Sequence, residues 1–142
     1  MQISTRTEYA LRALLEMAQA KNEPISAREI CERRHLPRKY IERLLGNLRS
    51  AGLIESVPGA KGGYILAQKP EEITLLRIMQ AVEDHSWEMS CNSNPPEHCD
   101  GKECGLYLVW GDIYQNMRSV LGGYSLDKIE EMTEMNNKGG SE

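Results

Sequence analysis

Long hydrophobic runs are absent from this sequence of 142 residues. No apolar stretch approaches the roughly 20 residues that a helix needs to cross a bilayer. The first residues, Met1-Gln-Ile-Ser-Thr-Arg, also lack the apolar core of a signal peptide. We therefore expect a cytoplasmic protein with no membrane partner. In that reducing compartment, clustered thiols are more often ligands or redox-active groups than structural disulfides.

The sequence also lacks an internal repeat and the usual signs of a catalytic site. The glycine-rich stretch at 59–63 has neither the spacing of a nucleotide-binding P-loop nor a helix start after it. We find no substrate pocket with a base or a nucleophile in the pattern of the chain. The length suits one compact domain with an appended helix. We therefore expect a protein that is not an enzyme.

Charge is distributed unevenly along the chain. Residues 1–70 hold twelve Lys and Arg against seven Asp and Glu, whereas residues 71–142 hold five against fourteen. The first half therefore carries a formal charge of +5 and the second half −9. A basic half attracts a polyanion, while an acidic half limits unspecific binding and suits protein contacts. Ordinary solvated surface charge is the alternative explanation.

Two capping boxes predict the first two helices. Thr5-Arg-Thr-Glu8 opens a helix over about 5–20, in which Glu8 suits the positive end of the helix dipole. Ser26-Ala-Arg-Glu29 opens a shorter helix that ends near Arg34. Cys31 lies inside this second helix, far from the other cysteines, and we expect it to be a core residue.

A third helix, from about Pro37 to Gly52, has one apolar and one polar face. Its apolar positions are Ile41, Leu44, Leu45 and Leu48, and its outward positions are Arg38, Lys39, Glu42, Arg43 and Asn47. Short helices followed by an apolar-backed helix with basic groups outward are typical of a helix-turn-helix, whose second helix enters the DNA major groove. The expected DNA contacts on these helices are Arg28, Arg38, Lys39, Tyr40 and Arg43.

Apolar runs at 53–57 and 64–66 surround the glycine-rich stretch and predict a β-hairpin. A hairpin directly after a recognition helix is a wing. Lys61 and Gly62 at its tip are expected to approach DNA, because glycine lets the backbone come close. An ordinary hairpin turn is the alternative.

The second half of the chain holds a loop between two helical patterns. Thr74 caps a helix that ends near Glu83, and the stripe from Leu106 to Val120 predicts a long helix with too much apolar surface for so small a body. We interpret it as a dimerisation helix, with burial in the core of the monomer as the alternative. The expected divisions are a winged helix-turn-helix at 1–84, a cysteine loop at 85–104, the dimerisation helix and a short terminal helix at 105–135, and a disordered tail at 136–142.

The loop at 85–104 carries Cys91, Cys99 and Cys104 among polar and turn-forming residues. Three incidental buried cysteines would have apolar neighbours, so a metal or cluster pocket is the better interpretation. Thiolates suit zinc and iron alike, and bare thiol switching remains a third reading. Iron–sulfur sites tolerate a ligand other than cysteine, which suits a loop that lacks a fourth cysteine. The candidate fourth ligands within the loop are His85, His98 and Asp100.

Taken together, these segments resemble the IscR-type iron–sulfur transcription regulators of bacteria, over nearly all of 1–135. The segments that carry the resemblance are Tyr9-Ala10-Leu11, Tyr40-Ile-Glu-Arg-Leu-Leu, Leu48-Arg-Ser-Ala-Gly-Leu, Gly59-Ala-Lys-Gly-Gly-Tyr64, Ile78-Met-Gln-Ala-Val-Glu83 and the three cysteines before Trp110. The resemblance implies a mostly α-helical, dimeric winged-helix regulator with a small β-hairpin. Its long helix would pair the subunits, and the loop before that helix would hold the cluster.

The resemblance also implies a set of ligands. They are Cys91, Cys99, Cys104 and, as in relatives that sense nitric oxide or redox state, Glu8 of the partner subunit. The gaps between the cysteines are unequal here, whereas the best-known members have equal gaps. Tyr107 stands where the member that names the family has a histidine ligand. Pro58 replaces an arginine common at the base of the wing, so contact there would rest on Lys61.

We therefore expect a homodimer whose affinity for a double-stranded DNA operator is set by an iron–sulfur cluster, with 2Fe-2S favoured over 4Fe-4S. The resemblance points to control of iron–sulfur cluster assembly or of a redox or nitric oxide response. The alternatives are a cluster-containing electron carrier and a sensor based on thiols or zinc. A carrier would not need the basic helix-turn-helix.

Overall fold

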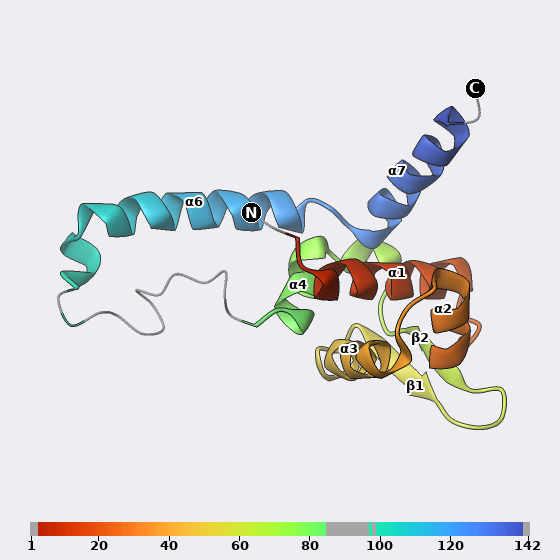
Figure 1. The fold of residues 1–142 in the computed structure, drawn as a ribbon. Helices are drawn as coiled ribbons and strands as arrows, with labels where there is room; N and C mark the ends of the chain where they lie inside the picture. The colour runs from red at the N-terminus through yellow and green to blue at the C-terminus, as the bar shows by residue number, and fades with distance from the viewer. Residues whose placement is uncertain (1–2, 85–96, 98, 141–142) are drawn as a thin grey trace.

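The computed structural model describes residues 3–84, 97 and 99–140. The elements follow in the order α1 (Thr5–Gln19), α2 (Ala27–Arg34), α3 (Arg38–Ser50), β1 (Ile54–Val57), β2 (Gly63–Leu66), η1 (Pro70–Glu72), α4 (Leu75–Val82), η2 (Gly101–Glu103), α6 (Gly105–Gly122) and α7 (Leu126–Gly139). Three N-terminal helices are followed by an antiparallel hairpin, and further helices follow the hairpin (Figure 1). This confirms the predicted winged helix-turn-helix with its C-terminal helices.

The caps of the first two helices separate a correct prediction from a wrong one. The box at Ser26 and Glu29 is confirmed, because each side chain binds the other residue's backbone N–H, at 3.1 and 2.9 Å. The box predicted at Thr5 and Glu8 is wrong by one residue. Ser4 is the N-cap of α1 and its hydroxyl accepts from the Thr7 backbone N–H at 3.3 Å. With Ser4 as the N-cap, the third helical residue is Thr7, so Glu8 lies one residue too far along to complete a capping box.

Helix α3 has the predicted buried face and the predicted end. Its buried residues are Ile41, Leu44, Leu45 and Leu48. Gly52 follows the helix in the left-handed region, with φ of 74°. The N–H groups of Gly52 and Leu53 donate to the carbonyls of Arg49 and Leu48, both at 3.0 Å. These two bonds form a Schellman ending, which explains the need for glycine at this position. Pro37 was predicted to be the first helical residue, but it is the N-cap, and the helix begins one residue later, at Arg38.

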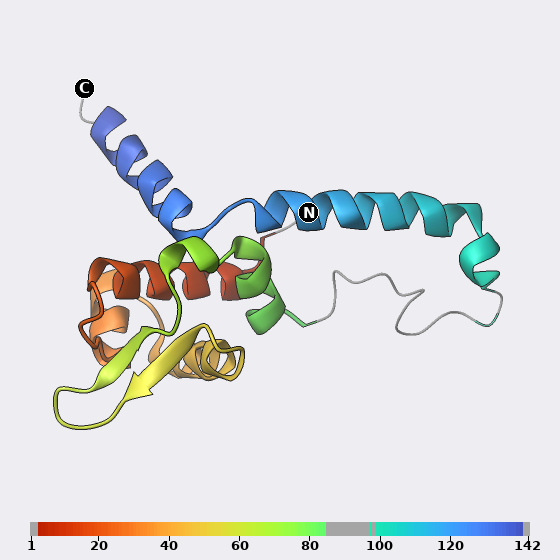
Figure 2. The same cartoon turned by 180° about the vertical axis from the view of Figure 1, so that it is seen from behind.

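The hydrophobic core lies where α1, α2, α3, α4 and the base of the hairpin meet (Figure 2). Its fully buried side chains include Leu14, Ile30, Ile41, Leu45 and Ile78. The start of α7 joins this body, because Leu126 is buried and its N–H donates to the Ile73 carbonyl at 2.8 Å. The N-terminal helices thus form one packed unit that presents α3 and the hairpin.

The hairpin pairs Ile54 with Leu66 at one end and Val57 with Gly63 at the other. An additional antiparallel bridge, which the sequence pattern did not suggest, joins Tyr64 of β2 to Ile25 before α2. Its two backbone hydrogen bonds measure 3.1 and 2.8 Å. The wing is therefore fastened to the helix-turn-helix as well as to its own partner strand.

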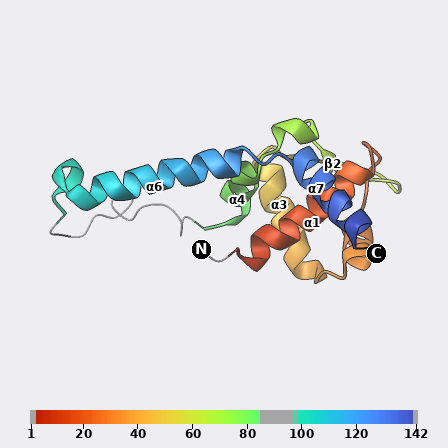
Figure 3. The same cartoon turned by 90° about the horizontal axis from the view of Figure 1, so that it is seen from above.

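The two C-terminal helices leave the body in different directions. Helix α6 contacts α4 and extends well beyond it, while α7 rises from the opposite end of the body (Figures 1 and 3). Within the described part of the chain, no helix combines the length and the apolar character that crossing a membrane requires.

The terminal helix is longer than expected. We expected a short helix and a disordered tail from residue 136, yet α7 runs to Gly139. The Gly140 N–H donates to the Asn136 carbonyl at 3.1 Å, inside the segment expected to be disordered. The composition of the tail is unfavourable for a helix, but a helix that has already formed extends at low cost, since each added residue gains one backbone bond.

Two glycines allow a test of how the wing is attached. A Cβ at Gly63, which has φ of 153°, would lie 2.5 Å from the Ile25 carbonyl group, whereas a Cβ at Gly46 inside α3 would meet nothing within 4 Å. We expect Gly63→Ala to lower the free energy of unfolding by about 1–3 kcal/mol. Gly46→Ala should raise it by roughly 0.5–1 kcal/mol. Urea unfolding followed by circular dichroism checks both, and an unchanged midpoint for Gly63→Ala would contradict the tight attachment.

Candidate nucleic-acid interface and metal centre

The exposed face of α3 is basic because its other face is committed to the core. Arg38, Lys39 and Arg43 are exposed. The Arg38 Nε donates to Glu42 at 3.1 Å, so this arginine has an ion-pair partner on its own helix. Within the described residues, Lys39 and Arg43 make no ion pair. Lys39 and Arg43 can therefore meet a phosphate or a base without first leaving a carboxylate.

Tyr40 lies between the core and this exposed face. It is half-buried, and its ring meets the ring of Tyr9 edge to face, with centroids 5.6 Å apart and planes at 86°. The ring therefore holds the first turn of α3 against α1. Because Tyr40 is only half-buried, part of its side chain remains accessible to a ligand.

The arginines of α2 have two different roles. Arg28 is exposed and donates to Glu32 at 2.8 Å, a bond that raises the pKa of Arg28. Arg33 and Arg34 instead bind the buried carboxylate of Glu16 on α1, at 3.4 and 2.5 Å. This cluster joins α1 to the end of α2. Sequence reasoning missed it, although a glutamate next to Leu14 and Leu15 on the buried side of a helix was a usable signal.

The tip of the hairpin is a tight turn that leaves Lys61 exposed. The Gly62 N–H donates to the Gly59 carbonyl at 3.0 Å. A Cβ at Gly62 would lie 2.1 Å from the Val57 carbonyl oxygen, so only glycine fits there. Helix α3 and the hairpin occupy the lower side of the molecule in Figures 1 and 2, opposite α6 and α7. The two elements that carry all of the predicted DNA-binding residues except Arg28 therefore lie on one side of the protein.

The described part of the cysteine loop places two thiols at the start of α6. Cys99 and Cys104 are half-buried and free, and they flank the short turn η2. Cys104 is the N-cap of α6, and its side chain makes no capping bond. Cys91 and the candidate ligands His85 and His98 lie outside the described residues. Among the described residues, no three His, Cys, Asp or Glu side chains gather around one point.

The other candidate ligands differ in their surroundings. Glu8 is exposed on the first part of α1 and binds Arg12 at 2.5 Å, one helical turn further on. Asp100 is exposed, and Tyr107 is half-buried in the first turn of α6. Cys31 is buried in the core, as predicted, and desolvation there raises the pKa of its thiol. Cys31 is therefore a poor ligand or nucleophile.

A polar cluster at the start of α1 was not visible in the sequence pattern. The Glu83 carboxylate accepts from the Ser4 hydroxyl and, at 2.5 Å, from the Thr7 hydroxyl. The neighbouring Asp84 accepts from Arg6 at 2.6 Å. Thr7 on the buried side of α1 was the one available signal. This cluster, Ser4, Arg6 and Thr7 with Glu83 and Asp84, fastens α1 to the chain that enters the cysteine loop.

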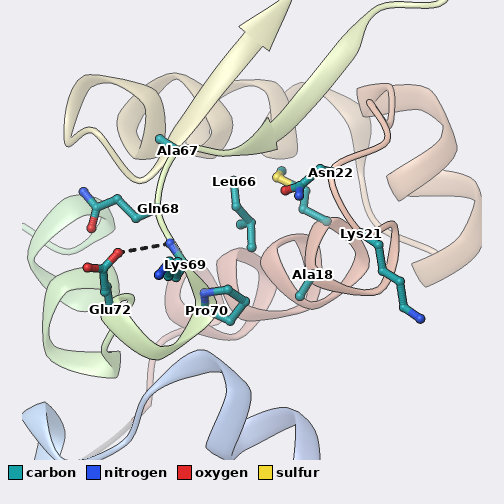
Figure 4. Close-up of a pocket in the computed structure, with 10 residues that line it drawn as sticks. Ala18, Lys21, Asn22, Leu66, Ala67, Gln68, Lys69, Pro70 and Glu72 are labelled. Carbon is teal, nitrogen blue, oxygen red and sulfur yellow. Dashed lines mark hydrogen bonds between the residues drawn. The ribbon is translucent and has the colours of Figure 1, made fainter.

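A cleft of about 590 Å³ lies on another part of the surface, between the end of α1 and the chain that follows β2 (Figure 4). Its lining mixes apolar residues such as Leu66 and Pro70 with Lys21, Asn22 and Gln68. The Lys69 backbone N–H donates to Glu72 at 3.2 Å at its edge. None of the predicted DNA-binding or metal-binding residues that the structure describes lines this cleft.

A helix-turn-helix with a basic outward helix, followed by a wing on the same side, defines a DNA-binding transcription regulator. The family model named Rrf2, described as an iron-dependent transcriptional regulator, matches residues 3–131. The chain belongs to this Rrf2 family. Its members are regulators rather than enzymes, in agreement with the prediction from the sequence.

Individual relatives support the same assignment. The chain is 34% identical over 131 residues to the transcriptional regulator IscR of Aliivibrio salmonicida, which covers 91% of this chain and 77% of that protein. Among solved structures it is similar to T. potens IscR, with a TM-score of 0.75 and 29% identity over 96% of this chain and 90% of that one. It is also similar to the oxidized form of Staphylococcus aureus CymR, with a TM-score of 0.68 and 35% identity over 92% of this chain and 97% of that one.

Proposed function

We propose that this Rrf2-family regulator is a homodimer whose affinity for a DNA operator is set by an iron–sulfur cluster. Cys91, Cys99 and Cys104 of one subunit and Glu8 of the partner subunit hold the cluster in this proposal. The supporting observation is the position of Cys99 and Cys104, which are free, half-buried and next to the start of a helix with an uncovered apolar face. In this proposal the helix that pairs the subunits directly follows the cysteine ligands, whereas Glu8 comes from α1 of the partner.

The DNA contacts follow from the charges on the lower side of the molecule. Arg43 and Lys39 reach base edges or phosphates directly. Arg38 does so after its ion pair with Glu42 is replaced by a contact with DNA. Arginine suits guanine because its guanidinium donates two parallel bonds. Tyr40 contributes its outer edge, and Arg28 contributes a phosphate contact from α2. At the wing tip, Lys61 approaches a phosphate or the minor groove, and the missing side chain of Gly62 allows a close backbone approach.

The dimer follows from the exposed apolar surface of α6. Leu106, Trp110 and Val120 are 63%, 50% and 60% exposed. A groove of about 310 Å³ on the same helix is lined mainly by Ile113, Met117, Val120 and Leu121. Soluble monomers rarely expose a continuous apolar surface of this kind. Pairing of two α6 helices about a two-fold axis covers this face in both copies at once.

The donor set fits an iron–sulfur cluster. Soft thiolates bind iron, and the N-terminus of α6 at Cys104 favours negative charge on the atoms beside it. Such a cluster, when bound, supplies a centre that responds to oxidants, to electrons or to nitric oxide. Glu8 offers a harder and more exchangeable oxygen ligand than a thiolate, and Arg12 must release it first. A 2Fe-2S cluster is favoured over a 4Fe-4S cluster, with cluster assembly or a redox response as the regulated process.

A regulator that uses bare thiols is the second candidate. The likeness to the oxidized form of S. aureus CymR favours this reading over zinc or an electron carrier. In that case Cys99 and Cys104 would respond to oxidants without iron. Iron and sulfide analysis of anaerobically purified protein, together with the visible spectrum and Mössbauer spectroscopy, separates the two candidates.

For DNA binding, we expect Arg43→Ala to lower operator affinity by about 1–3 kcal/mol, because one bidentate base contact is lost. The probe is a duplex selected by the wild-type protein from a random-sequence pool, and the readout is fluorescence anisotropy at fixed salt. Lys128→Ala on α7 is the matched control, because it removes one positive charge on the opposite side of the molecule. Unchanged affinity after joint substitution of Arg38, Lys39 and Arg43 by alanine would exclude α3 as the reading helix.

For the dimer, we expect Ile113→Glu to give a monomer at micromolar concentration, because a carboxylate cannot be buried without a partner. Gln115→Glu, outside the apolar stripe, adds the same charge to α6 and should remain dimeric. Sedimentation velocity reads both variants. The operator selected by the dimer should be roughly palindromic, with half-sites about one or two helical turns apart. If Ile113→Glu remains dimeric, the subunits do not pair through the apolar face of α6.

For the cluster, we expect Glu8→Ala to assemble it poorly or to lose it quickly in air, whereas Cys99→Ser and Cys104→Ser should abolish assembly. Arg12→Ala is the matched control, since it breaks the same ion pair and leaves the Glu8 carboxylate free. It should retain the cluster. The readouts are visible absorbance, reduction potential and iron content. If Glu8→Ala behaves like the parent protein in all three readouts, Glu8 is not the fourth ligand, and His98 or Tyr107 becomes the next candidate.

A further inference from the structure

We propose that the cleft between the end of α1 and the chain that follows β2 binds a small acid with one carboxylate and an apolar body. The bound acid changes the affinity of the protein for DNA, because one wall of the cleft is fastened to the end of the recognition helix. The inference goes beyond the proposed function, since it depends on DNA binding and not on a cluster.

The cleft has the size and the apolar floor of a small-molecule site. Its volume of about 590 Å³ falls in the range of roughly 300–1,000 Å³ that is usual for ligand pockets. The apolar lining includes Met17, Ala18, Leu66 and Pro70. Met17 is only 2% exposed, and Figure 4 shows Leu66 at the centre of the lining residues. The apolar part of a ligand is therefore removed from water against this floor.

The charged side chains that line the cleft favour a single negative charge on the ligand. Among the described lining residues, Lys21 and Lys69 are cations and Glu72 is the one anion, so the lining carries a net charge of +1. Neither lysine has an ion-pair partner within the described part of the chain. Glu72 already accepts the Lys69 backbone N–H at 3.2 Å. One carboxylate balances this lining, whereas several negative charges would leave an excess beside Glu72.

Lys21 and Asn22 form one end of the cleft in a fixed turn. Both are in the left-handed region, with φ of 49° and 71°. Lysine is uncommon there, so the surrounding structure holds the turn, and the Lys21 N–H donates to the Ala18 carbonyl at 3.2 Å. Figure 4 shows the Lys21 ammonium turned outward, on a stem flexible enough to reach a ligand. Its charge also opposes the rise in pKa that burial gives Glu130 on α7. Lys69, at the other end, is therefore the main anchor for the carboxylate.

The wall formed by residues 66–72 is fastened to the recognition helix and to α4. The Gln68 Nε2 donates to the carbonyl of Gly52, the glycine that ends α3, at 3.1 Å. The side-chain oxygen of Gln68 accepts from Arg77 of α4, and the same guanidinium donates to the Glu72 carbonyl at 3.1 Å. A ligand on this wall therefore touches the chain that holds the end of α3 and the base of the wing.

A ligand at this wall alters DNA binding only if it binds the free and the DNA-bound protein with different affinities. The coupling is reciprocal, so DNA must change the affinity for the acid by the same factor. A surface site without a link to α3 would give a factor of one in both directions.

The binding test uses phenylacetate, hexanoate and indole-3-acetate, each compared with its own neutral amide. NMR titration of full-length protein follows the backbone amides. We expect at least one acid to bind with a Kd of roughly 1 mM or tighter and to shift the amides of 18–22 and 66–72. The matching amide should bind about tenfold more weakly, because it loses the charge-assisted contact with lysine.

Three substitutions test the lining. Lys69→Gln should weaken the acid about tenfold and leave the amide unaffected. Lys21→Asn, which suits the left-handed backbone, should cause a smaller loss. Ala18→Leu fills the cleft from α1 and should abolish binding of acid and amide alike. Lys138→Gln on α7 is the matched control, because it removes one positive charge away from the cleft. Tm is measured for every variant to confirm that it is folded.

The DNA test uses the duplex selected by the wild-type protein and fluorescence anisotropy at fixed salt. Saturation with the acid that binds should change the Kd of the duplex by roughly 5–150-fold, and saturation with the duplex should change the Kd of the acid by the same factor. Ala18→Leu should lose both effects.

The possible results separate the site, its regulatory role and the proposed function. The site is overturned if none of the three acids binds, if acid and amide bind equally, or if the shifts fall on the apolar groove of α6. Binding at the cleft without a change in duplex affinity overturns the regulatory role. Each of these results leaves the proposed function standing, because the cluster is tested by iron content and absorbance.

Discussion

Burial of one face of α3 is the constraint on which the rest of the structure depends. Ile41, Leu44, Leu45 and Leu48 can reach the core only in one rotation of the helix about its axis. That rotation leaves Lys39 and Arg43 facing water. The basic surface is therefore a consequence of packing, and shifting the apolar pattern by one position would destroy both the core packing of α3 and its basic outer face. The buried Glu16, bound by Arg33 and Arg34, sets how α2 lies against α1.

A second constraint comes from apolar surface that the subunit leaves uncovered. The body formed by α1 to α4 is closed, with Leu126 sealing one edge at the start of α7. Helix α6 contacts this body only near α4 and carries the rest of its apolar side chains into solvent (Figure 1). Cys99 and Cys104 precede this helix, so a ligand bound by these two thiols would lie next to the place where a second copy would bind.

Local features of this fold were predictable from sequence, and long-range polar contacts were not. The capping pair Ser26 and Glu29, the glycine after α3 and the hairpin are each decided by a few neighbouring residues. Helix ends were less certain, as the one-residue error at Ser4 and the extension of α7 to Gly139 illustrate. The hydrogen bond from Thr7 to Glu83 joins residues 76 positions apart, and the hydrophobic periodicity of a sequence gives no information about such distant pairs. For the site, residue types were readable, whereas the pairing of Glu8 with Arg12 emerged only from the structure.

Helix α1 contacts both the recognition helix and the chain that precedes the cysteine loop. Its first turn binds the chain that enters the cysteine loop, its Tyr9 ring rests on Tyr40 of α3, and its Glu8 faces solvent. The interactions at the loop end are polar and partly exposed, while those toward α3 and the core are apolar. Polar exposed contacts rearrange at low cost, and packed apolar contacts move as a unit. Helix α1 is therefore joined by polar contacts to the chain that precedes the loop, and by packed side chains to α3.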